Sequence, residues 1–146
     1  MRHKWRDKLR RLCRLLIVRQ FMFSTEDIAR MVEPKELQDA AYGHNWDDGY
    51  EIPTAIACHP ACDLAVALTL FWLSEGVSLL TNEVKPNEYN IAWVKFCQLI
   101  TERILSNKYS ISSGKFIVPI GPTQQYKLKK LGIPAILISS IGAEIA

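Results

Sequence analysis

Four ionisable side chains lie within one short segment of the sequence: His44, Asp47, Asp48 and Glu51. Carboxylates beside a histidine could exchange protons with a substrate or hold a divalent cation. Adjacent aspartates point in different directions, however, and a calcium loop places its oxygen ligands at alternate positions. These carboxylates could equally cap turns and the following helix, because Asp bonds readily to nearby backbone. We predict no catalytic residue here. The two hypotheses that stay open are a partner-binding surface made by Asp47, Asp48 and Glu51, and a purely structural turn.

A second group of chemically competent side chains is Cys58, His59 and Cys62. Zinc sites use closely spaced cysteines together with a second pair, which would have to come from Cys97 or His44. A proline between the two cysteines breaks the helix that would align them. The sequence also lacks the G-x-x-x-x-G-K-[ST] phosphate loop and the G-x-S-x-G nucleophile elbow. We therefore predict no metal site and no cofactor, and expect the four cysteines to be reduced and buried.

The charge of the chain is unevenly distributed along the sequence. The 146 residues carry 18 bases and 15 acids, which gives a net charge of +3. Residues 1–21 hold eight bases and one acid, whereas residues 22–146 hold ten bases and fourteen acids. We predict a basic amphipathic extension over 1–21 and a single globular domain over 22–146. The acidic body disfavours nucleic-acid binding, and the short apolar runs predict no signal peptide, no membrane span and a cytoplasmic location.

Hydrophobic spacing and helix punctuation predict the elements that would position these residues. The pattern indicates an all-α fold of five to seven short helices around a buried central helix, with at most a minor β element. The central helix is Leu64–Ser74, apolar almost all round, with Asp63 as its N-cap and Gly76 as its terminator. The other predicted segments are a capped helix after Ser24, a helix over 34–42, a long amphipathic helix over 86–106, an extended stretch over 115–118, a cationic helix from Pro122 and a last apolar helix over 134–141. The predicted core residues are Phe71, Trp72, Trp93 and Phe96.

One run of the sequence resembles a known family. The residues Asn45–Pro53 read N-W-D-D-G-Y-E-I-P, and Cys62-Asp63-Leu64, Ala67-Leu68, Phe71 and Gly76 follow them. This arrangement is similar to the pattern N-W-D-D-G-[FY]-x-[IL]-P followed by C-D-L-G-T-A-L-x-x-F of the bacterial domain of unknown function 4274 family. The likeness covers about residues 33–80. Ala65 and Val66 depart from the pattern's Gly-Thr. The resemblance implies a small bacterial protein, some of whose relatives are encoded beside toxin–immunity pairs.

We predict a non-enzymatic, protein-binding domain, most concretely an immunity protein that neutralises a cognate toxin by occlusion. The body is small and mildly acidic, so its partner is expected to present a basic surface, as a nuclease toxin would. Two alternatives stay open. One is a structural or regulatory domain that oligomerises or binds another partner. The other is an enzyme or metal protein that uses His44, Asp47, Asp48 or Cys62.

Overall fold

The computed structural model describes residues 23–142. The predicted extension over 1–21, its boundary at residue 22 and Cys13 lie outside the described residues. Within them, seven α-helices and two short 3₁₀ helices alternate with loops, and no strand is present, which confirms the all-α prediction. The elements are α2 (Thr25–Ala29), α3 (Pro34–Gly43), η1 (Trp46–Asp48), α4 (Glu51–Ala57), α5 (Leu64–Leu73), α6 (Gly76–Leu80), α7 (Ile91–Leu105), α8 (Pro122–Lys130) and η2 (Ala135–Ile138).

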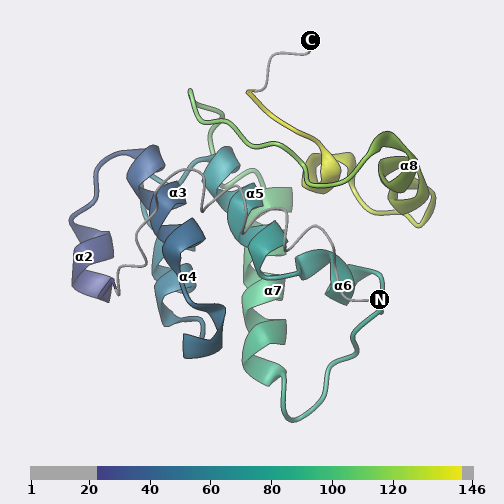
Figure 1. Cartoon of the computed structure of the whole chain (residues 1–146), viewed down its shortest axis with the longest axis horizontal. Helices are drawn as coiled ribbons and strands as arrows, with labels where there is room; N and C mark the ends of the chain where they lie inside the picture. Colours follow the sequence, from purple (N-terminus) through teal and green to yellow (C-terminus); the bar gives the residue numbers. More distant parts are fainter. Residues whose placement is uncertain (1–22, 143–146) are drawn as a thin grey trace.

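Helix α5 is the centre of the molecule, as its sequence predicts. All of its residues are buried, and it lies between α3 and α7 (Figure 1). The Asp63 carboxylate accepts a hydrogen bond from the Val66 amide at 3.0 Å, so it is the predicted N-cap. The fully buried Trp72 donates its indole N–H to the Leu137 carbonyl at 2.9 Å. That bond ties η2, near the end of the described chain, to the central helix.

The end of α5 differs from the prediction. Gly76 does not terminate α5 but is the first residue of α6, and Glu75 takes the left-handed conformation with φ 62°. A Cβ at position 76 would lie 2.5 Å from the Phe71 ring. Glycine is therefore needed there for close approach of the two helices rather than for a positive φ.

The long amphipathic helix also begins later than predicted. Helix α7 starts at Ile91, because the side chains of Asn87 and Asn90 bond to backbone groups of the preceding loop and compete with helix formation. Phe96 is buried as expected, whereas Trp93 is only half-buried and donates its indole N–H to the Ser74 carbonyl at 2.6 Å. Trp93 is thus at the edge of the core rather than inside it.

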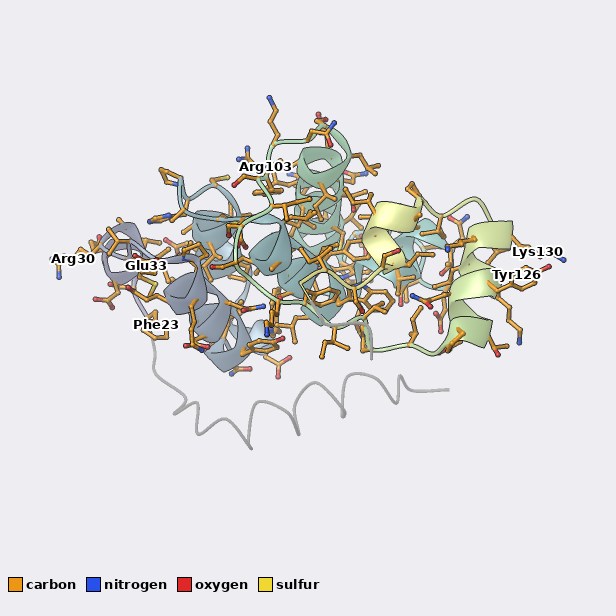
Figure 2. All side chains as sticks on the ribbon, turned by 90° about the horizontal axis from the view of Figure 1, so that it is seen from above. Phe23, Arg30, Glu33, Arg103, Tyr126 and Lys130 are labelled. Carbon is orange, nitrogen blue, oxygen red and sulfur yellow. The ribbon has the colours of Figure 1, made fainter. Side chains whose placement is uncertain are left out.

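The segment after α7 is less regular than the sequence indicates. The predicted extended stretch forms a single antiparallel bridge between Phe116 and Ile141. The predicted last helix is only the short η2, since Ile141 is used in that bridge. Helix α8 lies at the opposite end of the molecule from α2 (Figure 1). Figure 2 shows Tyr126 and Lys130 pointing outward from α8, with the Lys130 Nζ 5.2 Å from the centre of the Tyr126 ring.

Among the helices within residues 23–142, none has the length and apolar character needed to cross a membrane.

Candidate functional site

The segment between α3 and α4 is a closed turn built by its own backbone. The Asn45 side chain accepts a hydrogen bond from the Asp47 amide at 3.2 Å and so caps η1. Gly49 has φ 97°, a conformation that favours glycine. The His44 Nε2 donates to the Gly49 carbonyl at 2.9 Å, which holds the two ends of the turn together. The turn therefore has a defined shape before any partner arrives.

Aromatic rings fasten this turn to α7. The Trp46 ring lies edge-on to His44, with centroids 5.1 Å apart, and edge-on to Phe96 at 5.8 Å. Tyr50 stacks on Phe96, with centroids 5.5 Å apart and an interplanar angle of 25°. Such aromatic pairs add stability beyond the area they bury, about 0.5–1.5 kcal/mol each. They fix the direction in which the turn presents its polar residues.

The three predicted site carboxylates take no part in these aromatic contacts. Asp47, Asp48 and Glu51 are all exposed, and none of their carboxylates forms a hydrogen bond or ion pair with another described residue. Asn45 caps η1, and the N-cap residue of α4, Tyr50, makes no capping hydrogen bond with its side chain. Glu51 lies in the first turn of α4, where the helix dipole favours a negative charge. The capping hydrogen bonds expected of Asp47 and Asp48 in a purely structural turn are therefore absent among the described residues.

His44 is not arranged as an acid–base partner of these carboxylates. Its Nε2 is held by the Gly49 carbonyl and its ring faces Trp46, so the imidazole serves the turn. No hydrogen bond joins His44 to a carboxylate within residues 23–142. Proximity in the sequence suggests that His44 pairs with the neighbouring carboxylates, but in the structure His44 contacts Gly49 and Trp46 instead.

The cysteine group is also dispersed. Cys58 is exposed, contrary to the prediction that the cysteines are buried, while Cys62 is buried with its thiol directed at the Asp63 carbonyl. Burial raises the pKa of the Cys62 thiol well above its ordinary value, which disfavours the thiolate that a metal needs. His59 accepts the Ala61 amide through Nδ1 at 2.9 Å. Across the described part of the chain, no three His, Cys, Asp or Glu side chains come together as a metal site.

A cavity of about 330 Å³ lies at the start of α5 and is lined in part by Asp63, Gln38 and Gly114. Asp63 is only 3% exposed, and its two oxygens accept hydrogen bonds from the Val66 amide and the Ser112 hydroxyl. A Cβ at Gly114 would approach the Asp63 Oδ2 to 2.6 Å. Both oxygens of the Asp63 carboxylate thus accept hydrogen bonds, and these bonds join the 110–115 loop to α5.

Sequence reasoning missed a groove beside the acidic turn. It has a volume of about 340 Å³ and lies among Tyr50, Glu75, Val84, Tyr89 and Trp93. Its residues come from four separate segments, so no local pattern identifies it. The only sequence signal is Tyr89, an aromatic residue in the mostly polar stretch between α6 and α7.

One of three comparisons with known proteins gives a match. No curated protein matches the chain, and no solved structure matches it either. The family model described as "Domain of unknown function (DUF4274)" matches residues 32–105, which contain the acidic turn and the central helix α5. That match spans just over half of the chain. The chain therefore belongs to the DUF4274 family, a domain of unknown function.

Proposed function

We propose that this chain is a non-enzymatic, cytoplasmic protein-binding domain that acts as an immunity protein, neutralising a basic toxin by covering its functional surface. The observation that carries the proposal is the state of Asp47, Asp48 and Glu51. They are exposed on a turn of fixed shape, and no contact among the described residues uses their charge. A rigid acidic surface whose charges no described residue pairs with can bind a basic surface with little ordering cost.

The charge distribution supports a basic partner. Residues 23–102 contain thirteen acids and four bases, whereas residues 103–142 contain six bases and no acid. The negative charge is therefore concentrated on the part of the chain that contains most of the family match, and residues 32–105 of that match hold eleven acids and four bases. A field of this sign attracts a basic partner and speeds its association. A nuclease toxin presents Lys and Arg to the phosphates of its substrate, and an acidic surface can cover those side chains.

The non-enzymatic part of the proposal rests on how polar groups are used. The His44 imidazole is engaged by the Gly49 carbonyl, and the buried Asp63 carboxylate joins two segments of the fold. Tyr109 donates to the Ala57 carbonyl at 2.8 Å and accepts from the Arg103 Nε at 2.9 Å. Burial raises the Tyr109 pKa to about 12, so its phenol is a structural donor at neutral pH. Each of these groups has a structural role.

The alternative of a structural or regulatory domain is favoured by one observation. Helix α8 has no buried residue, and it carries Lys127, Lys129 and Lys130 beside the exposed Tyr126 and Leu131. This basic helix could bind the acidic turn of a second copy. An oligomer that persists at micromolar concentration in about 0.15 M salt would favour this alternative.

The experiment that tests the proposal uses the natural host. An immunity gene protects a bacterium from the toxin of its own siblings, so a strain that lacks this gene should be killed when it is grown in contact with its parent. A plasmid copy of the full chain should restore survival. Equal growth of the deletion strain and the parent in mixed culture, under conditions in which the parent expresses the gene, would contradict the proposal.

A further inference from the structure

Helix α8 is a regular helix that rests on the domain along one side only. It contains no buried residue. Its attachments are the Gln125 side chain, which donates to the Ile138 carbonyl at 2.8 Å, and Leu128, which packs against the core. Short helices in proteins gain most of their stability from packing of an apolar face, and α8 buries very little of its own surface. Its outer side is therefore available to something other than the fold.

The outer side of α8 is basic. Tyr126 and Lys130 are four residues apart and so share one side of the helix, where Figure 2 shows them pointing outward. Lys127 follows Tyr126 and Lys129 precedes Lys130, so these two lysines flank the same side. We call these four residues the α8 lysine face. All four are exposed, and none of the three ammonium groups forms an ion pair with a described residue.

The chemistry of the α8 lysine face fits an extended surface of negative charge. Its cations are all lysines, which act as point charges, whereas recognition of one carboxylate or phosphate favours the planar fork of arginine. Tyr126 is 60% exposed and Leu131, the C-cap residue, is 68% exposed, so an amphipathic ring and an apolar side chain accompany the charges. Tyrosine is enriched where the headgroups of a bilayer meet its hydrocarbon. An anionic phospholipid surface offers partners for both kinds of side chain.

A nucleic acid fits the same face less well. Proteins bind single strands in basic grooves with several aromatic rings, on which successive bases stack. The α8 lysine face is the convex side of a helix and has a single ring. The Lys130 Nζ already lies over that ring, 5.2 Å from its centre. The face therefore offers charge to a negative surface but little to a base.

The distribution of charge over the molecule would orient it on a negative surface. Residues 103–142 hold six bases and no acid, whereas residues 23–102 hold thirteen acids and four bases. In Figure 1, α3 and α4, which flank the acidic turn, lie across α5 from α8. An anionic surface attracts the basic end and repels the acidic one. The acidic turn would then face away from that surface.

We propose that α8 docks this chain on the surface of an anionic phospholipid bilayer. Lys127, Lys129 and Lys130 contact the headgroup phosphates, and the Tyr126 ring lies at the level of the headgroups. The helix stays on the surface, because its sequence lacks the wide apolar face of an inserting helix. The inference goes beyond the proposed function and does not depend on it. It gives the chain a position on a membrane that leaves the acidic turn accessible to a protein partner.

The test is co-sedimentation of the full chain with lipid vesicles in about 0.1 M salt, where charges interact over about 10 Å. We expect binding to vesicles of phosphatidylcholine and phosphatidylglycerol in equal parts, and none to phosphatidylcholine alone. Each lysine near an anionic surface contributes about fivefold to binding. The variant with Lys127→Gln, Lys129→Gln and Lys130→Gln should therefore bind on the order of a hundredfold more weakly. Equal sedimentation with the two kinds of vesicle, or undiminished binding by this variant, would overturn the proposal.

A matched variant separates the α8 lysine face from the general charge of the chain. Lys35, Lys85 and Lys95 are exposed as well, but they lie within residues 23–102. The variant with Lys35→Gln, Lys85→Gln and Lys95→Gln therefore removes the same charge at other places. We expect it to bind the mixed vesicles nearly as well as the wild type. A loss equal to that of the α8 glutamine variant would overturn docking through α8.

A second variant separates loss of charge from disturbance of the helix. Replacement of the α8 lysines by arginine, as Lys127→Arg, Lys129→Arg and Lys130→Arg, keeps the three charges on a good helix former. This variant should retain binding to the mixed vesicles. A loss as large as that of the glutamine variant would overturn docking by charge. Far-UV circular dichroism verifies that both variants keep the helix content of the wild type.

Other occupants of the α8 lysine face give different results with the same variants. If the face binds nucleic acid, a labelled oligonucleotide binds the wild type but not the glutamine variant, and the mixed vesicles do not sediment the chain. If it binds the acidic turn of a second copy, the wild type is an oligomer without vesicles and the glutamine variant is a monomer. Either result would overturn docking on a bilayer. Vesicle binding involves no toxin, so its outcome and that of the mixed-culture test are independent.

Discussion

Replacement of Trp72 by alanine tests whether the segment after α7 is an integral part of the fold. Trp72 is fully buried in α5, and its indole N–H donates to the Leu137 carbonyl, itself on a fully buried residue. Truncation of a large buried aromatic side chain costs about 3–5 kcal/mol. The Leu137 carbonyl would lose its indole donor as well, at an added cost of about 1–3 kcal/mol. We therefore expect Trp72→Ala to remove about 4–8 kcal/mol, a large part of the stability of an ordinary domain, about 5–15 kcal/mol.

The assay is equilibrium unfolding of the full chain in urea, followed by far-UV circular dichroism. Trp72→Phe keeps a ring against Phe71 and loses chiefly the hydrogen bond and some volume, so it should cost about 1–3 kcal/mol. Trp93→Phe is the matched control at a half-buried tryptophan and should cost about 1 kcal/mol. A cost below about 1 kcal/mol for Trp72→Ala would refute the placement of Trp72 in the core. If Trp72→Phe leaves the free energy of unfolding unchanged, only the proposed stabilising role of the hydrogen bond to Leu137 is refuted.

Three further predictions concern separate parts of the chain. Iodoacetamide and peptide mass mapping of the native chain should label Cys58, which is exposed, and leave Cys97 unlabelled, because burial raises the Cys97 pKa to about 12; equal labelling would contradict this. Gly76→Ala should cost about 1–3 kcal/mol in urea unfolding, because its Cβ would lie 2.5 Å from a buried ring, and a neutral result would show that the helices separate freely. The hydrogen bond from the Ser24 amide holds the Asp27 pKa below its ordinary value of 3.8. The ionised Asp27 carboxylate therefore stabilises the fold fully above pH 3.8, and this stabilisation is lost as the pH falls through the lower pKa of the folded state. An NMR titration that places the Asp27 pKa at or above 3.8 would contradict that prediction.

The parts of the fold that the sequence predicts correctly are those governed by local chemistry. The uniform apolarity of α5 identifies the buried helix, and its polar neighbour Asp63 identifies its start. The Ser24 and Asp27 capping box is present as predicted, with both reciprocal bonds. The predicted cationic helix begins at Pro122, and Gly132 follows it with φ 87°, a conformation typical of glycine just after a helix. Each of these features depends on residues within a turn or two of one another.

The errors arise where distant contacts override a local preference. Gly76 looked like a helix terminator, but the proximity of Phe71 explains why it is glycine, and Glu75 takes the strained conformation. Ile141 was assigned to a helix, but it bridges to Phe116. The candidate site shows the same division. The position and exposure of the acidic turn follow from its sequence, whereas the groove beside it exists only because the loop before α7 folds back towards Tyr50.

We propose that the carboxylates of the turn act on a partner and not on the fold. The most direct measurement is survival of the deletion strain in mixed culture when it carries the full chain with Asp47→Asn, Asp48→Asn and Glu51→Gln. Because these side chains make no hydrogen bond or ion pair among the described residues, the melting temperature should stay within a few degrees of the wild type. We predict that this stable variant fails to protect. Full protection by the variant would contradict the account, and so would a marked loss of melting temperature, which would make the turn structural.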